Sequence, residues 1–173
     1  MDQEIVSKTT SFHQQQMILD LICIHRERIT SLMRLNKWVD HNTIQRMVAQ
    51  LIQESRTNLL ELRSWLSPLL LSEPADRKEG KGELYASWPG IPKLSPGCQW
   101  QELIRFFEED EKTFSLMYMK LLCRRGIFSR ELRKIFSRHL ARSQKRTASL
   151  RVCFSCPETD GVANPEHSTR LAI

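Results

Sequence analysis

The stretch QQMILDLICIHRERITSLMRLNKW, residues 15–38, decides the fold because its apolar side chains follow the period of an α-helix. The repeated positions fall three or four residues apart, which is the spacing that puts side chains on one face of a helix. The face consists of Ile18, Leu21, Ile22, His25, Ile29, Leu32 and Met33. We therefore expect a long helix that buries this face and carries one histidine into the interior.

Three further segments show the same helical period. The second helix is predicted to begin with a cap at Asp40 or Asn42 and to end before Pro68, because the residue that precedes a proline disfavours helical geometry. The third spans about residues 99–124 and the fourth about residues 129–150, with Gly126 in the turn between them. Short turns within each pair predict two antiparallel helical hairpins.

A long connection joins the two hairpins. Residues 72–97 are rich in proline and glycine, which is typical of a loop. Leu84, Tyr85, Trp88 and Ile91 are too apolar for a free linker, so we expect part of the connection to pack across the helices. The sequence thus predicts an all-α fold, an antiparallel four-helix bundle of two helical hairpins joined by a long crossover.

The predicted bundle covers residues 15–151. It follows a flexible N-terminus at residues 1–14 and precedes a disordered tail at residues 152–173, where the helical period stops and small polar residues surround Pro157, Gly161 and Pro165. The tail contains a CxxC formed by Cys153 and Cys156, with His167 downstream. This is half of a zinc motif without a second ligand pair, so two ordinary thiols are the preferred interpretation.

The composition is that of a soluble globular protein. Hydrophobic residues make up 40% of the 173 residues and charged residues 27%, with a net charge of +6. No apolar stretch approaches the roughly 20 residues of a membrane-spanning helix, and the N-terminus lacks the pattern of a secretion signal. Five cysteines, an odd number, do not suggest a disulfide framework. We therefore expect a cytoplasmic protein without a membrane span.

Several patterns within these helices coincide with those of a known group. The first helix carries LIxIxxxRI at residues 21–29, and the second alternates Gln, Glu and Leu. The third carries an ExxE stretch from Glu108, followed by Phe114, Tyr118 and Leu121, and the fourth carries RELRKIFSRHLARSQKRTASLR at residues 130–151. Over about residues 15–151 the chain resembles a bacterial family of ferritin-like four-helix proteins with a domain of unknown function. The resemblance implies a ferritin-like fold and little about activity, because fold does not fix function.

Four polar residues fall near the middle of the four helices, on or beside the apolar faces: His25, Ser55, Glu111 and His139. In an antiparallel bundle they lie at similar height, so we expect a hydrogen-bonded polar layer that fixes the helix register. A mononuclear metal site at His25, Glu111 and His139 is the alternative. The full di-metal site of ferritin-like proteins is not predicted, because the sequence lacks its Glu-x-x-His motifs. No other cofactor is predicted.

The fourth helix is strongly basic, which is the pattern of a surface that tracks a phosphate backbone. The candidate nucleic-acid contacts are Arg130, Arg133, Lys134, Arg138, Arg142, Lys145 and Arg146. We prefer the interpretation that part of this face pairs with the acidic third helix, because no aromatic side chains are interleaved for stacking on bases. The acidic residues concerned are Glu102, Glu108, Glu109, Asp110 and Glu111.

The sequence shows no glycine-rich phosphate loop, GxSxG elbow or recognisable catalytic Cys–His pair. We therefore expect a non-enzymatic helical bundle that acts through self-association or protein partners, in a stress-related setting that the family resemblance suggests. Two alternatives remain. One is a metal-binding or oxidoreductase ferritin relative with a reduced metal site, and the other is nucleic-acid binding through the basic fourth helix.

Overall fold

The computed structural model describes residues 2–70, 82–90, 100–124 and 126–155, which form five helices. They are α1 (Asp2–Asn36), α2 (Asn42–Leu70), α3 (Glu83–Ala86), α4 (Trp100–Cys123) and α5 (Arg130–Ser155). Within these residues there is no strand, so the all-α prediction is confirmed. None of the described helices is both long enough and apolar enough to cross a membrane.

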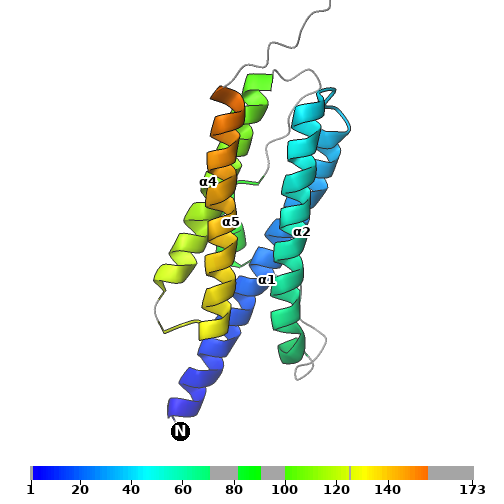
Figure 1. Cartoon of the computed structure of the whole chain (residues 1–173). Helices are drawn as coiled ribbons and strands as arrows, with labels where there is room; N and C mark the ends of the chain where they lie inside the picture. The colour runs from blue at the N-terminus through cyan, green and yellow to red at the C-terminus, as the bar shows by residue number, and fades with distance from the viewer. Residues whose placement is uncertain (1, 71–81, 91–99, 125, 156–173) are drawn as a thin grey trace, which may run out of the picture.

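The four long helices lie side by side as two antiparallel pairs (Figure 1). α1 pairs with α2 and α4 pairs with α5, while α5 also lies against α2. In the connection between α4 and α5, Gly126 adopts φ +75°, a backbone conformation that glycine reaches without strain. α2 ends at the opposite end of the molecule from the start of α4, so these two helices run in the same direction (Figure 1).

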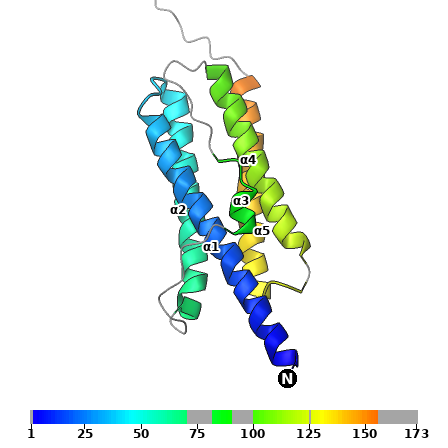
Figure 2. The same cartoon turned by 180° about the vertical axis from the view of Figure 1, so that it is seen from behind.

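The short helix α3 lies against α1, on the side of the molecule seen in Figure 2. The buried carboxylate of Asp20 on α1 accepts hydrogen bonds from the backbone N–H groups of Gly82 at 2.8 Å and Tyr85 at 3.1 Å. Asp20 therefore caps the N-terminus of α3, because the N-cap residue, Gly82, has no side chain that could do so. A side chain at residue 82 would displace this carboxylate, because a Cβ atom there would lie 2.6 Å from an Asp20 oxygen.

The apolar core consists of two clusters at different levels along the helices. The first draws on all four long helices and on Trp88, and its largest buried side chains include Phe114, Tyr118 and Phe136. The second lies nearer the C-terminal end of α1 and includes Leu32 and Phe107. The expectation that the connection packs across the helices is confirmed for its described part, since Trp88 is buried in the first cluster.

Several helix boundaries differ from the sequence prediction. α1 begins at Asp2 rather than near Gln15, so residues 2–14, expected to be flexible, are helical. No proline or glycine occurs in residues 2–36, and the usual sequence cause of a helix break is therefore absent there. α2 continues past Pro68 to Leu70, and α5 continues past residue 151 to Ser155.

Some predicted features fall elsewhere. Met33, assigned to the apolar face of the first helix, is 45% exposed because it lies at the edge of the buried stripe. Cys23 is half-buried and Cys123 is exposed, and neither forms a disulfide bond with a described residue. The rest of the predicted disordered tail, with Cys156 and His167, lies outside the described residues, as does Ile91.

Candidate functional site

A cluster of buried polar side chains, which we call the polar layer, separates the two apolar clusters. It consists of Arg28, Ser55, Asp110, Glu111, Ser115 and Ser143. Arg28 of α1 lies at its centre, where Nε donates to Asp110 Oδ2 at 2.7 Å and Nη2 donates to Glu111 Oε1. Its Nη1 donates to Ser55 Oγ on α2 at 3.2 Å. One side chain of α1 thus links α2 and α4.

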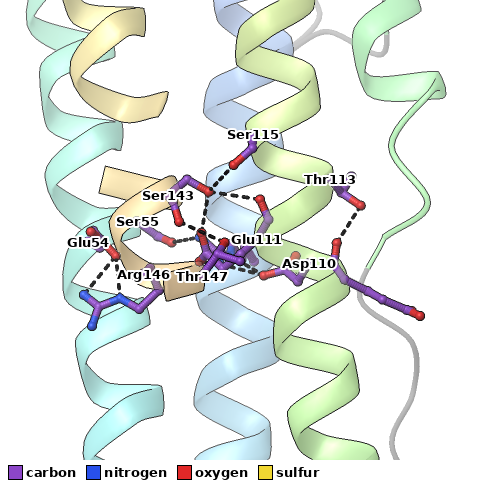
Figure 3. Close-up of polar contacts among 11 residues, drawn as sticks. Glu54, Ser55, Asp110, Glu111, Thr113, Ser115, Ser143, Arg146 and Thr147 are labelled. Carbon is purple, nitrogen blue, oxygen red and sulfur yellow. Dashed lines mark hydrogen bonds and ion pairs between the residues drawn. The ribbon is translucent and has the colours of Figure 1, made fainter. Parts of the chain in front are cut away.

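Helix α5 closes the polar layer from the other side (Figure 3). Ser143 Oγ lies 2.5 Å from Glu111 Oε2 and 3.0 Å from the main-chain oxygen of Glu111. Because a serine has one hydroxyl proton, Ser143 donates to one of these oxygens at a time. Ser115 Oγ in turn donates to Ser143 Oγ at 3.1 Å. All four long helices therefore contribute to one hydrogen-bonded layer. It contains Ser55 and Glu111, as the sequence predicted, but His25 and His139, predicted for the same layer, bond to Tyr118 instead.

The charges in the polar layer are not balanced, since one guanidinium faces two carboxylates. Burial raises the pKa of Asp110 to about 6, and the neighbouring Glu111 adds to this shift while Arg28 opposes it. Burial by itself would lower the pKa of Arg28, but Asp110 and Glu111 raise it above its ordinary value. Arg28 therefore stays charged, and Asp110 takes up a proton at a higher pH than an ordinary aspartate does.

Next to the polar layer lies a second buried arrangement, the histidine–tyrosine chain of His25, Tyr118, His139 and Glu61. His25 Nε2 lies 2.7 Å from the hydroxyl oxygen of Tyr118, and that oxygen lies 2.9 Å from His139 Nδ1. His139 Nε2 lies 3.2 Å from Glu61 Oε2. Glu61 is half-buried and also accepts from Arg138 and Arg142 on α5. The chain therefore runs from the core to the surface between α2 and α5.

The carboxylate of Glu61 fixes the direction of every hydrogen bond in this chain. A carboxylate only accepts, so His139 Nε2 carries the proton and His139 Nδ1 accepts from the Tyr118 hydroxyl. The Tyr118 oxygen then accepts from His25 Nε2–H. His25 Nδ1 is left as a bare lone pair, and it is indeed a buried nitrogen without a hydrogen-bond partner.

Both histidines are neutral at neutral pH. Burial lowers the pKa of His25 well below its ordinary value, and the nearby His139 and Arg28 lower it further. Burial also lowers the pKa of His139 to about 4, although Glu61 opposes the shift. Burial alone would raise the pKa of Glu61, but hydrogen bonds from Arg142 and Arg138 lower it. The chain therefore keeps its charge at its outer end.

The structure brings two of the three proposed metal ligands together and separates the third. His25 and His139 share the Tyr118 hydroxyl, with ring centroids 6.2 Å apart. Glu111 is bound instead by Arg28 and Ser143 in the polar layer. Within the described part of the chain no group of three or more His, Cys, Asp or Glu side chains is arranged to hold a metal ion. The three predicted ligands therefore do not converge in this structure, and Glu111 takes its positive partner from the guanidinium of Arg28.

The basic residues of α5 divide into a paired set and an exposed set. Arg138 and Arg142 bind Glu61, and Arg146 binds Glu54 (Figure 3), so these three pair with α2 rather than with the acidic α4. Arg133 donates to the main-chain oxygen of Leu122 at 2.9 Å. The predicted ion pairs between basic residues of α5 and Asp110 and Glu111 are wrong. Both carboxylates pair with Arg28 of α1 in the polar layer instead.

The exposed set consists of Arg130, Lys134 and Lys145. Arg130 and Lys134 border an open hollow of about 580 Å³ together with Phe128, Arg133, Ser137 and Arg138. None of the described residues that line this hollow is acidic. Among the seven predicted nucleic-acid contacts, Arg130 and Lys134 near the start of α5 and Lys145 farther along it therefore remain exposed to an anion.

No protein-family model, curated protein or solved structure matches this chain.

The residues that organise the site were partly missed by sequence reasoning, which did not single out Arg28, Tyr118 or Glu61. A signal was present for two of them, since Arg28 lies three residues after His25 and Tyr118 lies seven after Glu111, so each pair shares a helix face. Nothing in the sequence showed which charge would pair with which.

Proposed function

We propose that the protein is a ferritin-like four-helix bundle that acts without catalysis, by associating with a second copy of itself. The bundle assignment is supported by the order of the helices, because an antiparallel pair, a long connection and a second antiparallel pair with α2 and α4 in the same direction require one crossover. A cytoplasmic location and a stress-related role belong to the same proposal.

The non-catalytic part of the proposal is supported by the hydrogen bonding of the interior. The buried carboxylates are held by Arg28 and Ser143, and the two histidines are held by Tyr118. Groups held in this way set the relative height of the helices and specify one packing. The alternative of a metal-binding or oxidoreductase relative draws no support from these contacts, since the same side chains would have to release their partners.

The observation that carries self-association is an apolar strip on the outward face of α4. Leu116 is 46% exposed and Met119 is 38% exposed, and exposed Cys123 follows on the same face. The spacing of three and four residues makes this one continuous strip. Exposed apolar side chains that adjoin one another are typical of an interface.

A second copy of α4 fits this strip by shape. If two α4 helices pair antiparallel about the middle of the strip, Leu116 of one copy lies against Met119 of the other, and each exposed apolar side chain is covered. A two-fold dimer is the commonest way to use such a self-complementary surface.

The test is the solution mass of the full chain, measured by light scattering under reducing conditions at several concentrations. We expect a dimer that becomes monomeric in the double variant Leu116→Lys/Met119→Lys. Leu60→Lys is the matched control, because Leu60 is 64% exposed on α2, away from the strip. A wild-type protein that stays monomeric at high concentration, or a double variant that remains dimeric, would contradict the proposal.

A second candidate function, contact with a nucleic-acid backbone, is favoured by the basic hollow at the start of α5. Binding of this kind is insensitive to sequence and weakens steeply with salt. Fluorescence anisotropy with a labelled DNA duplex should show affinity at low salt that Arg130→Glu/Lys134→Glu removes. The exposed Arg63 on α2 provides a control in Arg63→Glu. Equal loss in both variants would indicate a net-charge effect rather than a site.

A further inference from the structure

Beside the polar layer, a partly enclosed cavity of about 270 Å³ lies between α4 and the segment that follows α3. Its walls include Trp88 and Phe106, and its polar lining includes Glu109, Asp110 and Thr113. The cavity therefore combines two aromatic rings with two carboxylates. None of the described residues that line it is a lysine or an arginine.

The aromatic walls are firmly placed. Trp88 is buried in the first apolar cluster and makes an edge contact with Tyr85, and Phe106 is buried in the second cluster against Phe107. The faces of such rings carry partial negative charge and attract cations, most strongly where water is excluded. The cavity thus lies at the level where the two clusters are separated by charged groups.

The carboxylates give the described lining of the cavity a net negative charge. Asp110 belongs both to the cavity and to the polar layer, where Arg28 is shared between Asp110 and Glu111. One guanidinium shared by two buried carboxylates leaves a net negative charge among these three described residues at neutral pH. Only Asp110 Oδ2 bonds to Arg28, so the Asp110 carboxylate keeps capacity to accept from a further donor.

We propose that this cavity binds a small organic cation, an alkylammonium group held between the rings of Trp88 and Phe106 with its charge next to Asp110 and Glu109. The ligand supplies the positive charge that the polar layer lacks. A quaternary ammonium uses the rings and the charge, whereas a primary amine also donates hydrogen bonds to the carboxylates. The shared chemistry is the monovalent alkylammonium.

Calorimetric titration of the full chain with choline chloride tests the proposal directly. The matched probe is 3,3-dimethylbutan-1-ol, which has the same shape with a carbon in place of the charged nitrogen. We expect choline to bind at least about tenfold more tightly than the alcohol, as a desolvated cation–π contact with charge pairing should provide. A parallel titration with n-butylamine distinguishes a quaternary from a primary ammonium. Equal binding of choline and the alcohol, or no binding of choline and n-butylamine, overturns the proposal.

Three variants locate the site. Asp110→Asn removes the buried charge with little change in shape and should weaken choline about tenfold, and Trp88→Leu should do the same through the lost ring. Glu109→Gln changes an exposed side chain, so it leaves the fold intact and should weaken choline about threefold. Glu108→Gln, one residue away and outside the cavity lining, is the control and should bind as the wild type does. An unchanged affinity in Glu109→Gln and Asp110→Asn would show that choline binds elsewhere.

Discussion

The polar layer and the histidine–tyrosine chain lie side by side in the same core, but they reduce the free-energy cost of burying polar groups in opposite ways. The polar layer keeps its groups ionised and pairs them, with Arg28 between two carboxylates. The chain keeps His25 and His139 neutral and places its only formal charge at Glu61, near the surface. A buried charge without its partner is far more costly than a buried neutral group, so the two regions should respond very differently to perturbation.

The largest effect is expected in the polar layer. Arg28→Leu leaves Asp110 and Glu111 as buried carboxylates without a counter-charge, which should lower the free energy of unfolding by about 3–5 kcal/mol. Urea denaturation followed by circular dichroism measures this. The triple variant Arg28→Leu/Asp110→Asn/Glu111→Gln removes all three charges and should lose much less. If the single variant is no less stable than the triple variant, the layer is not held by its charges.

Acid should expose the difference between the two regions. His139, with a folded pKa of about 4 against about 6.5 when unfolded, binds fewer protons in the folded state, so its contribution to stability falls as pH falls from about 6.5 to 4. His25 acts in the same direction. Asp110 opposes them, because its folded pKa of about 6 lies above its ordinary value and folding takes up a proton between about pH 6 and 4.

We therefore expect a net loss of about 2–3 kcal/mol between pH 7 and 4.5, since two histidines outweigh one aspartate. Glu61, whose pKa is lowered, adds a further loss at the acid end of this range. Asp110→Asn removes the opposing group, so its stability should fall more steeply with acid than that of the wild type. Urea midpoints measured across the pH range decide this, and parallel curves for the two proteins would contradict the protonation of Asp110.

A smaller effect is expected at the centre of the histidine–tyrosine chain. Tyr118→Phe removes the hydroxyl that bonds both histidines, which leaves His25 Nε2 and His139 Nδ1 unsatisfied and should cost about 1–3 kcal/mol. Thermal unfolding at pH 7 measures the loss. Tyr85→Phe is the control, since its hydroxyl bonds Glu27 at an exposed site and should cost at most about 0.5 kcal/mol. Equal losses would mean that the buried hydroxyl is not needed.

The smallest effect is expected at the protein surface, where arginines of α5 form ion pairs with glutamates of α2. Arg146→Ala breaks a partly exposed pair with Glu54, at 3.1 Å, and should cost at most about 1 kcal/mol. The cost should shrink in high salt, because exposed pairs are screened and the buried pairs of Arg28 are not. Unfolding curves at low and high salt measure this contrast. A salt-insensitive loss would indicate that packing of the Arg146 stem matters more than its charge.

The sequence predicted the helices better than the site. The periodicity around Ile18 and Leu32 and the turn at Gly126 are local features, and both are found in the structure. The burial of Ser55, Glu111 and His139 also followed from their places in the helices, although His139 joins the histidine–tyrosine chain rather than the polar layer. The hydrogen-bond partners of these residues could not be predicted from the sequence. Each partner lies on a different helix, far away in the sequence, as for His25 with Tyr118 and Arg28 with Asp110.

By itself, therefore, the sequence determined that this chain is helical, which faces are apolar and at which heights polar residues enter the core. These properties depend on the α-helical period and on the conformational preferences of single residues. Only the tertiary structure decided that Arg28 pairs with the carboxylates of α4, that arginines of α5 form ion pairs with glutamates of α2, and that Asp20 caps α3. Those choices are made by distance and burial, because a charge in the core binds whichever opposite charge lies within reach.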